Sequence, residues 1–217
     1  MSDIIREVDE ELRREDWENV WKNYGKFVIG GAVAIVIATA AVVAWREYDE
    51  SQRIAQGILF AEAVARVENA SSPQEAAEIM AALAADAPAG YATLARFREA
   101  KYRADAGDRG AAVALYDGLA SDPAIEPMFQ DLATLYAVRM QISGGDPAAL
   151  TARLAPLTVP GNPWRYTALE LTAVLGLAVG DTEAARRIYA PLADDPGTPE
   201  SLRARAAEML RALGPTE

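Results

Sequence analysis

The chain has 217 residues, a formal net charge of −11, and neither cysteine nor histidine. Without cysteine there are no disulfides, thiolate metal sites or thiol catalysis, and without histidine the commonest general base and transition-metal ligand is missing. The sequence therefore predicts a protein that is not an enzyme and that has no metal, no cofactor and no small-molecule substrate. Because no basic cluster stands out against the acidic total, nucleic acid is not an expected partner.

The first element in chain order is an apolar run over residues 27–45. It carries no charged side chain, and as a helix it would span about 28 Å, close to the hydrocarbon core of a bilayer. The run predicts a single transmembrane helix that contacts membrane lipid, preceded by a charged tail over residues 1–26. A cleaved signal peptide and a buried core helix are the alternatives. The acidic leader argues against the first, and the lack of a polar face argues against the second.

Lysine and arginine are biased to the N-terminal side of this run. Within 15 residues of it, four of them precede the run and two follow it. Because positive charge is enriched on the cytoplasmic side of a membrane, we expect the tail in the cytoplasm and the rest of the chain on the opposite side.

Small residues line one side of the predicted span. Gly30, Ala34 and Ala38 are spaced by four, with Gly31 alongside. Small residues at this spacing let two helices approach closely in lipid. The four positions therefore form a candidate helix-packing face, the alternative being an alanine-rich anchor in which small residues have no special role.

Residues 46–217 are rich in alanine and show no strand-like alternation, so we expect α-helices throughout. Gly107, Gly145 and Gly180 mark turns at intervals of 38 and 35 residues, a period typical of helix-hairpin repeats. After each glycine a small or aliphatic residue follows at the fifth position, a large one at the ninth and leucine at the twelfth. The predicted fold class is all-α: one N-terminal transmembrane helix, then an α-solenoid of hairpins. The solenoid domain is expected over 46–213, with hairpins at about 46–87, 90–122, 127–158 and 163–194 and a capping helix at 199–213.

Each predicted turn has a chemical explanation. The glycine is expected to end the first helix in a left-handed conformation, and the aspartate after it to cap the second helix. Pro156 and Pro191 lie in a repeated Ala-Pro-Leu, so a proline is expected to kink or shorten the second helix at the same point in both hairpins.

The anchor helix is expected to continue into the repeat domain, to about Asn69. Only Gly57 interrupts good helix formers in this stretch, and it costs about 1 kcal/mol relative to alanine. An apolar stripe along it is predicted to pack on the helix over 73–86; its members are Ile54, Ile58, Ala61, Val64 and Ala65.

The Gly-Asp turn followed by small, large and aliphatic positions resembles the second helix of the tetratricopeptide repeat. The first helices, over 92–106 and 130–144, fit the spacing of that family less well. The resemblance implies a fold of the tetratricopeptide type, and thus protein binding.

The whole chain resembles a narrower family, the ancillary subunit of the bacterial Sec translocon. The likeness rests on the short charged tail, the single span, the segment Ala44-Trp45-Arg46-Glu47-Tyr48 after it, and Tyr91 to Phe97 at the start of the second hairpin. It implies a single-pass inner-membrane protein with a periplasmic repeat domain, the Sec translocon and a periplasmic peptidyl-prolyl isomerase as partners, and a link to chaperoning of exported chains. It implies no catalytic residues.

Matching positions on two first helices form a candidate partner-binding groove. Lys101 and Arg139 each lie six residues before a turn glycine, and Phe97 and Leu135 lie one turn earlier. Together they could bind a segment of a partner. The alternative is that Phe97 and Leu135 are core and that the two basic side chains are solvated.

The function predicted from the sequence is a membrane-anchored protein-interaction scaffold, accessory to the Sec translocon and to periplasmic chaperoning. The alternative is an accessory subunit or assembly factor of another inner-membrane complex, respiratory or of the cell envelope, in which the anchor carries the specificity.

Overall fold

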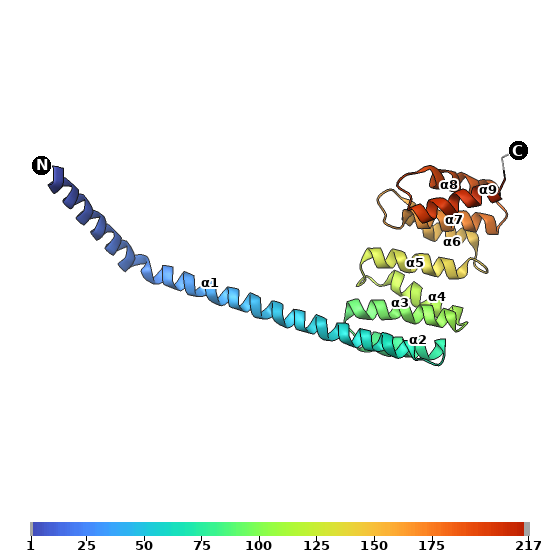
Figure 1. Ribbon diagram of the computed structural model, residues 1–217, viewed down its shortest axis with the longest axis horizontal. Coiled ribbons are helices and arrows are strands. Elements are labelled where there is room, and N and C mark those ends of the chain that lie inside the picture. The colour runs from blue at the N-terminus through green and yellow to red at the C-terminus, as the bar shows by residue number, and fades with distance from the viewer. Residues whose placement is uncertain (1, 215–217) are drawn as a thin grey trace. The chain divides into compact units, whose positions relative to one another are not determined.

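The computed structural model describes residues 2–214, which form α-helices and one short 3₁₀ helix without strands (Figure 1). The predicted all-α class is thus confirmed for the described part of the chain. The protein consists of two compact units, Met1–Ala55 and Gln56–Glu217. The elements are α1 (Ser2–Glu68), α2 (Pro73–Asp86), α3 (Ala89–Asp105), α4 (Arg109–Ser121), α5 (Pro127–Gln141), α6 (Pro147–Leu154), the 3₁₀ helix η1 (Ala155–Thr158), α7 (Arg165–Ala178), α8 (Thr182–Asp194) and α9 (Glu200–Ala212).

The first unit consists of α1 as far as Ala55. Among the described residues, one helical segment, Ile29–Glu68, is long and apolar enough to cross a membrane, with a mean hydropathy of 1.9 in its most apolar window. None of that window is buried within the protein, and large side chains such as Ile35, Val36 and Trp45 are exposed. A core helix would have its apolar side chains covered, so the structure disfavours that alternative.

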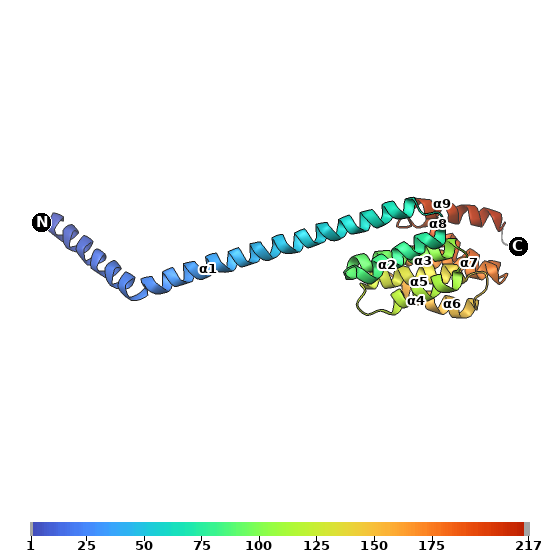
Figure 2. The ribbon, with the colours of Figure 1, turned by 90° about the horizontal axis from the view of Figure 1, so that it is seen from below.

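In the second unit, successive helices pack against one another in chain order. Helix α2 packs on α3, α3 on α4, α4 on α5, and the pattern continues through α9 (Figures 1 and 2). The repeat positions predicted to face inward are all buried, with at most 4% of any side chain exposed; they are Ala112, Tyr116, Leu119, Leu150, Leu154, Leu157, Ala185, Tyr189 and Leu192. The period of the sequence therefore marks the interior of the hairpins.

The predicted aspartate caps are all present. Asp108, Asp146 and Asp181 each accept a hydrogen bond from a backbone N–H in the first turn of the following helix, at 3.0, 3.1 and 2.8 Å. Ser72 caps α2 in the same way through the N–H of Glu75. Each contact satisfies a donor that the helix itself cannot pair.

The predicted left-handed glycines occur in two of the three turns. Gly107 has φ of 88° and Gly180 has φ of 82°, but Gly145 is not among the glycines with positive φ. Its N–H instead donates to the Gln141 carbonyl at 2.7 Å, and an added Cβ would lie 3.0 Å from that oxygen and from Leu150 Cδ1. Gly145 is therefore needed for close packing between α5 and α6 and not for a left-handed backbone.

The two Ala-Pro-Leu segments behave differently, so the second helix is not shortened at the same point in both hairpins. Helix α6 ends at Leu154, and Pro156 lies in η1, as expected for a shortened helix. Helix α8 continues past Pro191 to Asp194, because the Pro191 carbonyl still accepts a hydrogen bond from the Asp195 N–H at 2.9 Å.

The stripe predicted along the C-terminal part of α1 is also wrong. Ile54 and Ile58 are 59% and 54% exposed, and Ala61 and Ala65 are exposed as well, leaving only Val64 partly buried. Within the second unit the inward side of α1 carries Gly57, Phe60, Ala63, Val64 and Val67. An added Cβ on Gly57 would lie 3.2 Å from the Tyr91 hydroxyl oxygen, and the rings of Phe60 and Tyr91 are 5.6 Å apart. Gly57 thus lies close to the Tyr91 hydroxyl of α3, on the inward side of α1.

Helix α9 covers the C-terminal end of the repeat stack. Arg205 of α9 forms a two-pronged ion pair with Glu170 of α7, with nitrogen–oxygen distances of 2.8 and 2.9 Å. The guanidinium of Arg186 on α8 donates to the backbone carbonyls of Leu213, at 2.9 Å, and Gly214. The last hairpin is therefore joined to the residues that follow it through a half-buried arginine.

Candidate partner-binding groove

A groove lies between α3 and α5, which are the first helices of two successive hairpins, and Tyr116 of α4 lines its floor. It consists of two hollows of about 490 and 400 Å³ that share Leu94 and Phe129 in their walls. Leu94, Phe97, Lys101 and Asp105 contribute from α3; Phe129, Leu132, Tyr136, Arg139 and Met140 contribute from α5; and Tyr116 contributes from α4. We refer to the two hollows together as the α3–α5 groove.

Four aromatic side chains form the centre of the groove. The Phe97 ring lies 6.0 Å from Tyr116, 6.4 Å from Phe129 and 6.2 Å from Tyr136, measured between centroids. Tyr136 stacks on Tyr116 at 5.2 Å, and 36% of Tyr136 is exposed. Such packed rings present a rigid, amphipathic surface at low entropic cost, which is typical of binding sites.

Tyr116 forms the buried floor of this aromatic cluster, with 4% of its surface exposed. Burial, followed by the neighbouring Tyr136 and Asp105, raises the pKa of its hydroxyl to about 12, while Arg139 opposes this shift. The neutral form of the hydroxyl is therefore favoured at the base of the groove.

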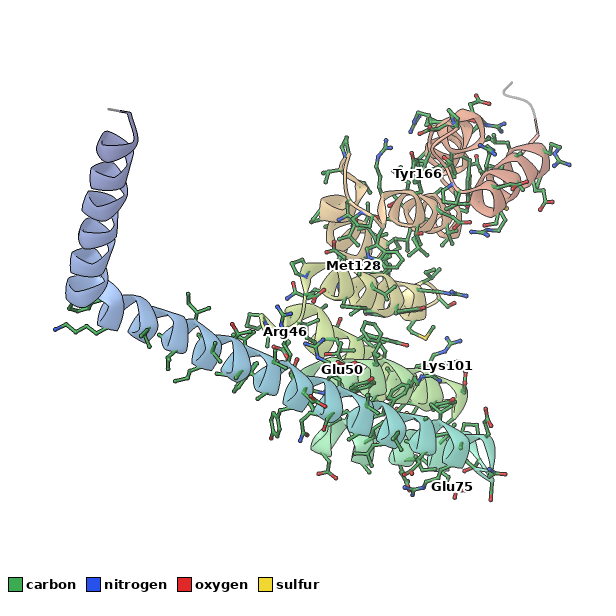
Figure 3. The ribbon with its side chains drawn as sticks, turned by 60° about the vertical axis from the view of Figure 1, so that its left-hand side comes forward. Arg46, Glu50, Glu75, Lys101, Met128 and Tyr166 are labelled. Atoms are coloured by element: carbon green, nitrogen blue, oxygen red, sulfur yellow. The ribbon has the colours of Figure 1, made fainter. Side chains whose placement is uncertain are left out.

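Basic side chains collect at one end of the groove. Lys101 pairs with Asp105 at 2.5 Å and is 63% exposed, Arg98 lies over the Phe60 ring at 5.5 Å, and Arg139 is exposed. In Figure 3 the Lys101 side chain projects from the far end of α3. This end therefore carries three positive charges and one negative charge.

The other end of the groove is apolar. Its hollow is formed by the start of α3 and the segment leading into α5, with Ala89, Gly90, Leu94, Ile125 and Phe129 in its wall. Leu94 is 41% exposed, and Met128 beside Phe129 in the chain is 45% exposed. Glu126 is the charged side chain in this lining.

Comparison with protein families identifies the architecture. A family model for the tetratricopeptide repeat-like domain matches residues 18–205, most of the chain. The chain belongs to the tetratricopeptide repeat-like family. No curated protein and no solved structure matches it. Domains of this family are typically non-catalytic scaffolds for protein–protein interaction, and the match includes α3, α4 and α5, which form the groove.

Within this tetratricopeptide repeat-like domain, three of the four predicted groove residues lie together. Phe97, Lys101 and Arg139 line the same hollow. Leu135 does not: it is 4% exposed and packs in the core with Val138 and Leu150. On helix α5 Tyr136 lines the groove next to Arg139, whereas Leu135 packs against residues of α6 and α7. The prediction for Leu135 is therefore wrong. The alternative agrees with the structure in placing Leu135 in the core and in leaving Lys101 and Arg139 exposed, while Phe97 is partly buried; the use of the groove for binding stays a prediction.

Sequence reasoning missed Leu94, Phe129 and Tyr136. A signal was present on α5, because residues 129, 132, 136 and 140 are apolar or aromatic at helical spacing. The same helix has a second apolar face, which includes Leu135 and Val138, so its sequence is compatible with either face lining the groove. The two faces cannot be told apart until the neighbours of α5 are known.

The predicted packing face on the membrane-spanning segment is exposed. Gly30, Gly31, Ala34 and Ala38 all lie on the open surface of α1, and a Cβ built on either glycine has no atom within 4 Å. The face has room for a second helix, and its use for packing stays a prediction. Among the residues that the structure describes, no cluster of acidic side chains could hold a metal ion.

Proposed function

We propose that this protein is a membrane-anchored scaffold that holds a segment of a partner protein in the α3–α5 groove. The observation that supports this function best is the groove itself: a rigid aromatic floor with Leu94 and Tyr136 exposed at its edge. Exposed apolar surface in a concave, well-packed setting is a mark of interaction sites. The family of the chain and its apolar N-terminal helix are consistent with a scaffold held at a membrane.

We further propose that the partners are the Sec translocon and a periplasmic folding factor, and that the protein assists exported chains. The resemblance of the segments around Trp45 and Tyr91 to the ancillary translocon subunit supports this finer assignment. In this proposal residues 1–26 are a cytoplasmic tail, 27–45 span the inner membrane, and 46–213 form the periplasmic domain.

Reversal of the two groove charges tests the scaffold function. The double variant Lys101→Glu with Arg139→Glu is expected to keep the melting temperature of the full-length protein nearly unchanged, because both side chains are exposed and exposed charges contribute about 0–1 kcal/mol. It is expected to lose the proteins that copurify with the wild type in mild detergent, as measured by quantitative mass spectrometry.

The matched control is Arg109→Glu with Arg187→Glu, which makes the same charge change at two exposed positions outside the groove. It is expected to retain all partners. Full recovery of partners by the groove variant would refute the proposed site. That result would favour the alternative function, in which the anchor binds another inner-membrane complex. The double variant Gly30→Leu with Ala34→Leu then tests whether the small-residue face of the anchor makes this contact.

A further inference from the structure

We infer that the α3–α5 groove selects an amphipathic partner segment of one polarity: bulky apolar side chains lie at the Leu94–Phe129 end, and a carboxylate lies between Lys101 and Arg139. This inference rests on the proposed function, since it names the chemistry of the segment that the scaffold binds. It is carried by the unequal distribution of charge along the groove.

The charge balance at the basic end favours an acidic group. Arg98, Lys101 and Arg139 supply three positive charges, and Asp105 removes one. The carboxyl ends of α3 and α5 each add roughly half a negative charge through their helix dipoles. About one net positive charge remains. Residues 46–217 carry 24 acidic and 16 basic side chains, so most of this surface repels a carboxylate and the basic end is an exception.

Of the three cations, Arg139 is the one most open to a partner. Lys101 is engaged with Asp105 and Arg98 with the Phe60 ring, whereas no ion pair joins Arg139 to another residue in the part of the chain that the structure describes. A guanidinium can bind a carboxylate through two parallel hydrogen bonds, which fixes the direction of approach. The adjacent Tyr136 gives the partner an aromatic surface beside that contact.

The opposite end attracts the same group less. Its lining is mostly apolar, with the hydroxyl groups of Tyr91 and Thr93 and the carboxylate of Glu126. The amino ends of α3 and α5 each add roughly half a positive charge there, which offsets Glu126 and leaves about no net charge. Leucine or phenylalanine side chains gain from burial there, at about 25 cal/mol for each Å² removed from water. The groove extends along α3 from Gly90 to Asp105, about 22 Å at 1.5 Å per residue. A segment of about 15 residues fills it as a helix, and one of about seven fills it as a strand.

A peptide array tests this inference with defined probes. Immobilised 15-residue peptides carry a Leu-Phe-Leu block at either end and, at the other end, three glutamates, three glutamines or three lysines. The full-length protein, reconstituted in lipid nanodiscs, is applied at increasing concentration. Glutamate peptides are expected to bind about tenfold more tightly than lysine peptides, because the exposed charge contacts that attract glutamate and repel lysine together separate the two binding free energies by on the order of 1.4 kcal/mol.

Variants of the scaffold identify where the selection occurs. Lys101→Glu with Arg139→Glu is expected to invert the preference to lysine peptides, Lys101→Arg with Arg139→Lys is expected to keep it, and Arg187→Glu is expected to leave it unchanged. Equal binding of all three charge series that is lost in Leu94→Gln would overturn the charge inference while leaving the groove as the site. No binding by any series, in the wild type or in the variants, would overturn the inference and the proposed function together.

Discussion

Glu99 is the carboxyl group most affected by folding among the described residues. Its side chain points into the packed interior of the second unit, with 9% of the residue exposed, and its nearest cation is Arg103 at 3.6 Å. Burial raises the pKa of Glu99 above the ordinary value of 4.5, and Arg103 only partly offsets this effect. The ionised form is thus less favourable in the folded protein than in the unfolded chain.

Glu99→Gln is expected to reduce the loss of stability that accompanies rising pH. Because the folded pKa is the higher one, the folded state binds more protons than the unfolded state once the pH exceeds 4.5, and stability falls as the pH rises through the folded pKa. The neutral glutamine removes this contribution. Melting temperatures between pH 4.5 and 7 measure it, with the exposed Glu208→Gln as the control. A steeper decline in the variant than in the wild type would contradict the assignment.

At the scale of single residues, the sequence was informative where one periodic signal dominated. Tyr116, Leu154 and Tyr189 were predicted to be buried, and they are, since each lies on the only strongly apolar face of a second helix. Leu135 was misplaced because α5 has two apolar faces. Ile54 and Ile58 were misplaced because the inward side of α1 carries Gly57, which lies close to the hydroxyl of Tyr91, 34 residues away in the chain.

At the scale of elements, the turns show one motif with two physical origins. Gly107 and Gly180 end their helices with a left-handed backbone that other residues adopt at a cost. Gly145 is also followed by an aspartate that caps the next helix. Here, however, glycine is required because a Cβ would obstruct the close approach of α5 to α6. The sequence could locate these turns, because Gly-Asp is a strong signal, but it could not distinguish the two origins.

Alanine and asparagine substitutions, compared at each turn, separate these origins. Gly107→Ala is expected to cost about 1–2 kcal/mol through backbone strain, and Gly107→Asn less, because asparagine tolerates a left-handed backbone. Gly145→Ala and Gly145→Asn are both expected to destabilise, since any Cβ meets the Gln141 carbonyl. Urea unfolding of the full-length protein in detergent measures these changes. Rescue of Gly145 by asparagine would mean that its backbone conformation, not its packing, is the constraint.

At the scale of the whole molecule, the anchor and the repeat domain were predictable for different reasons. The run over 27–45 is recognisable from apolar length alone, and the hairpins from a period of 35–38 residues. The α3–α5 groove was only partly predictable, because it depends on how two helices about 40 residues apart are rotated. Its partner depends on surfaces that lie in another protein.

Alkaline phosphatase fused after Glu217 tests the topology of the whole chain. The fusion is expected to be active, because four basic residues precede the apolar run within 15 residues and two follow it, a bias that favours a repeat domain outside the cytoplasm. A cytoplasmic reporter at the same position is the control and is expected to be inactive. An inactive phosphatase fusion together with an active cytoplasmic reporter would place the groove in the cytoplasm and exclude a periplasmic partner.

The contact between Arg186 and the carbonyls of residues 213 and 214 has a consequence for the order of folding. During synthesis at about 5–20 residues per second, these carbonyls follow Arg186 by roughly 1–6 s. Until then the guanidinium lacks these two acceptors. The residues that line the groove all lie between Ala89 and Met140, well before these carbonyls in the chain. The groove residues are therefore synthesised before the segment that completes the last hairpin, and this order differs from one in which the two ends of the domain must be made together.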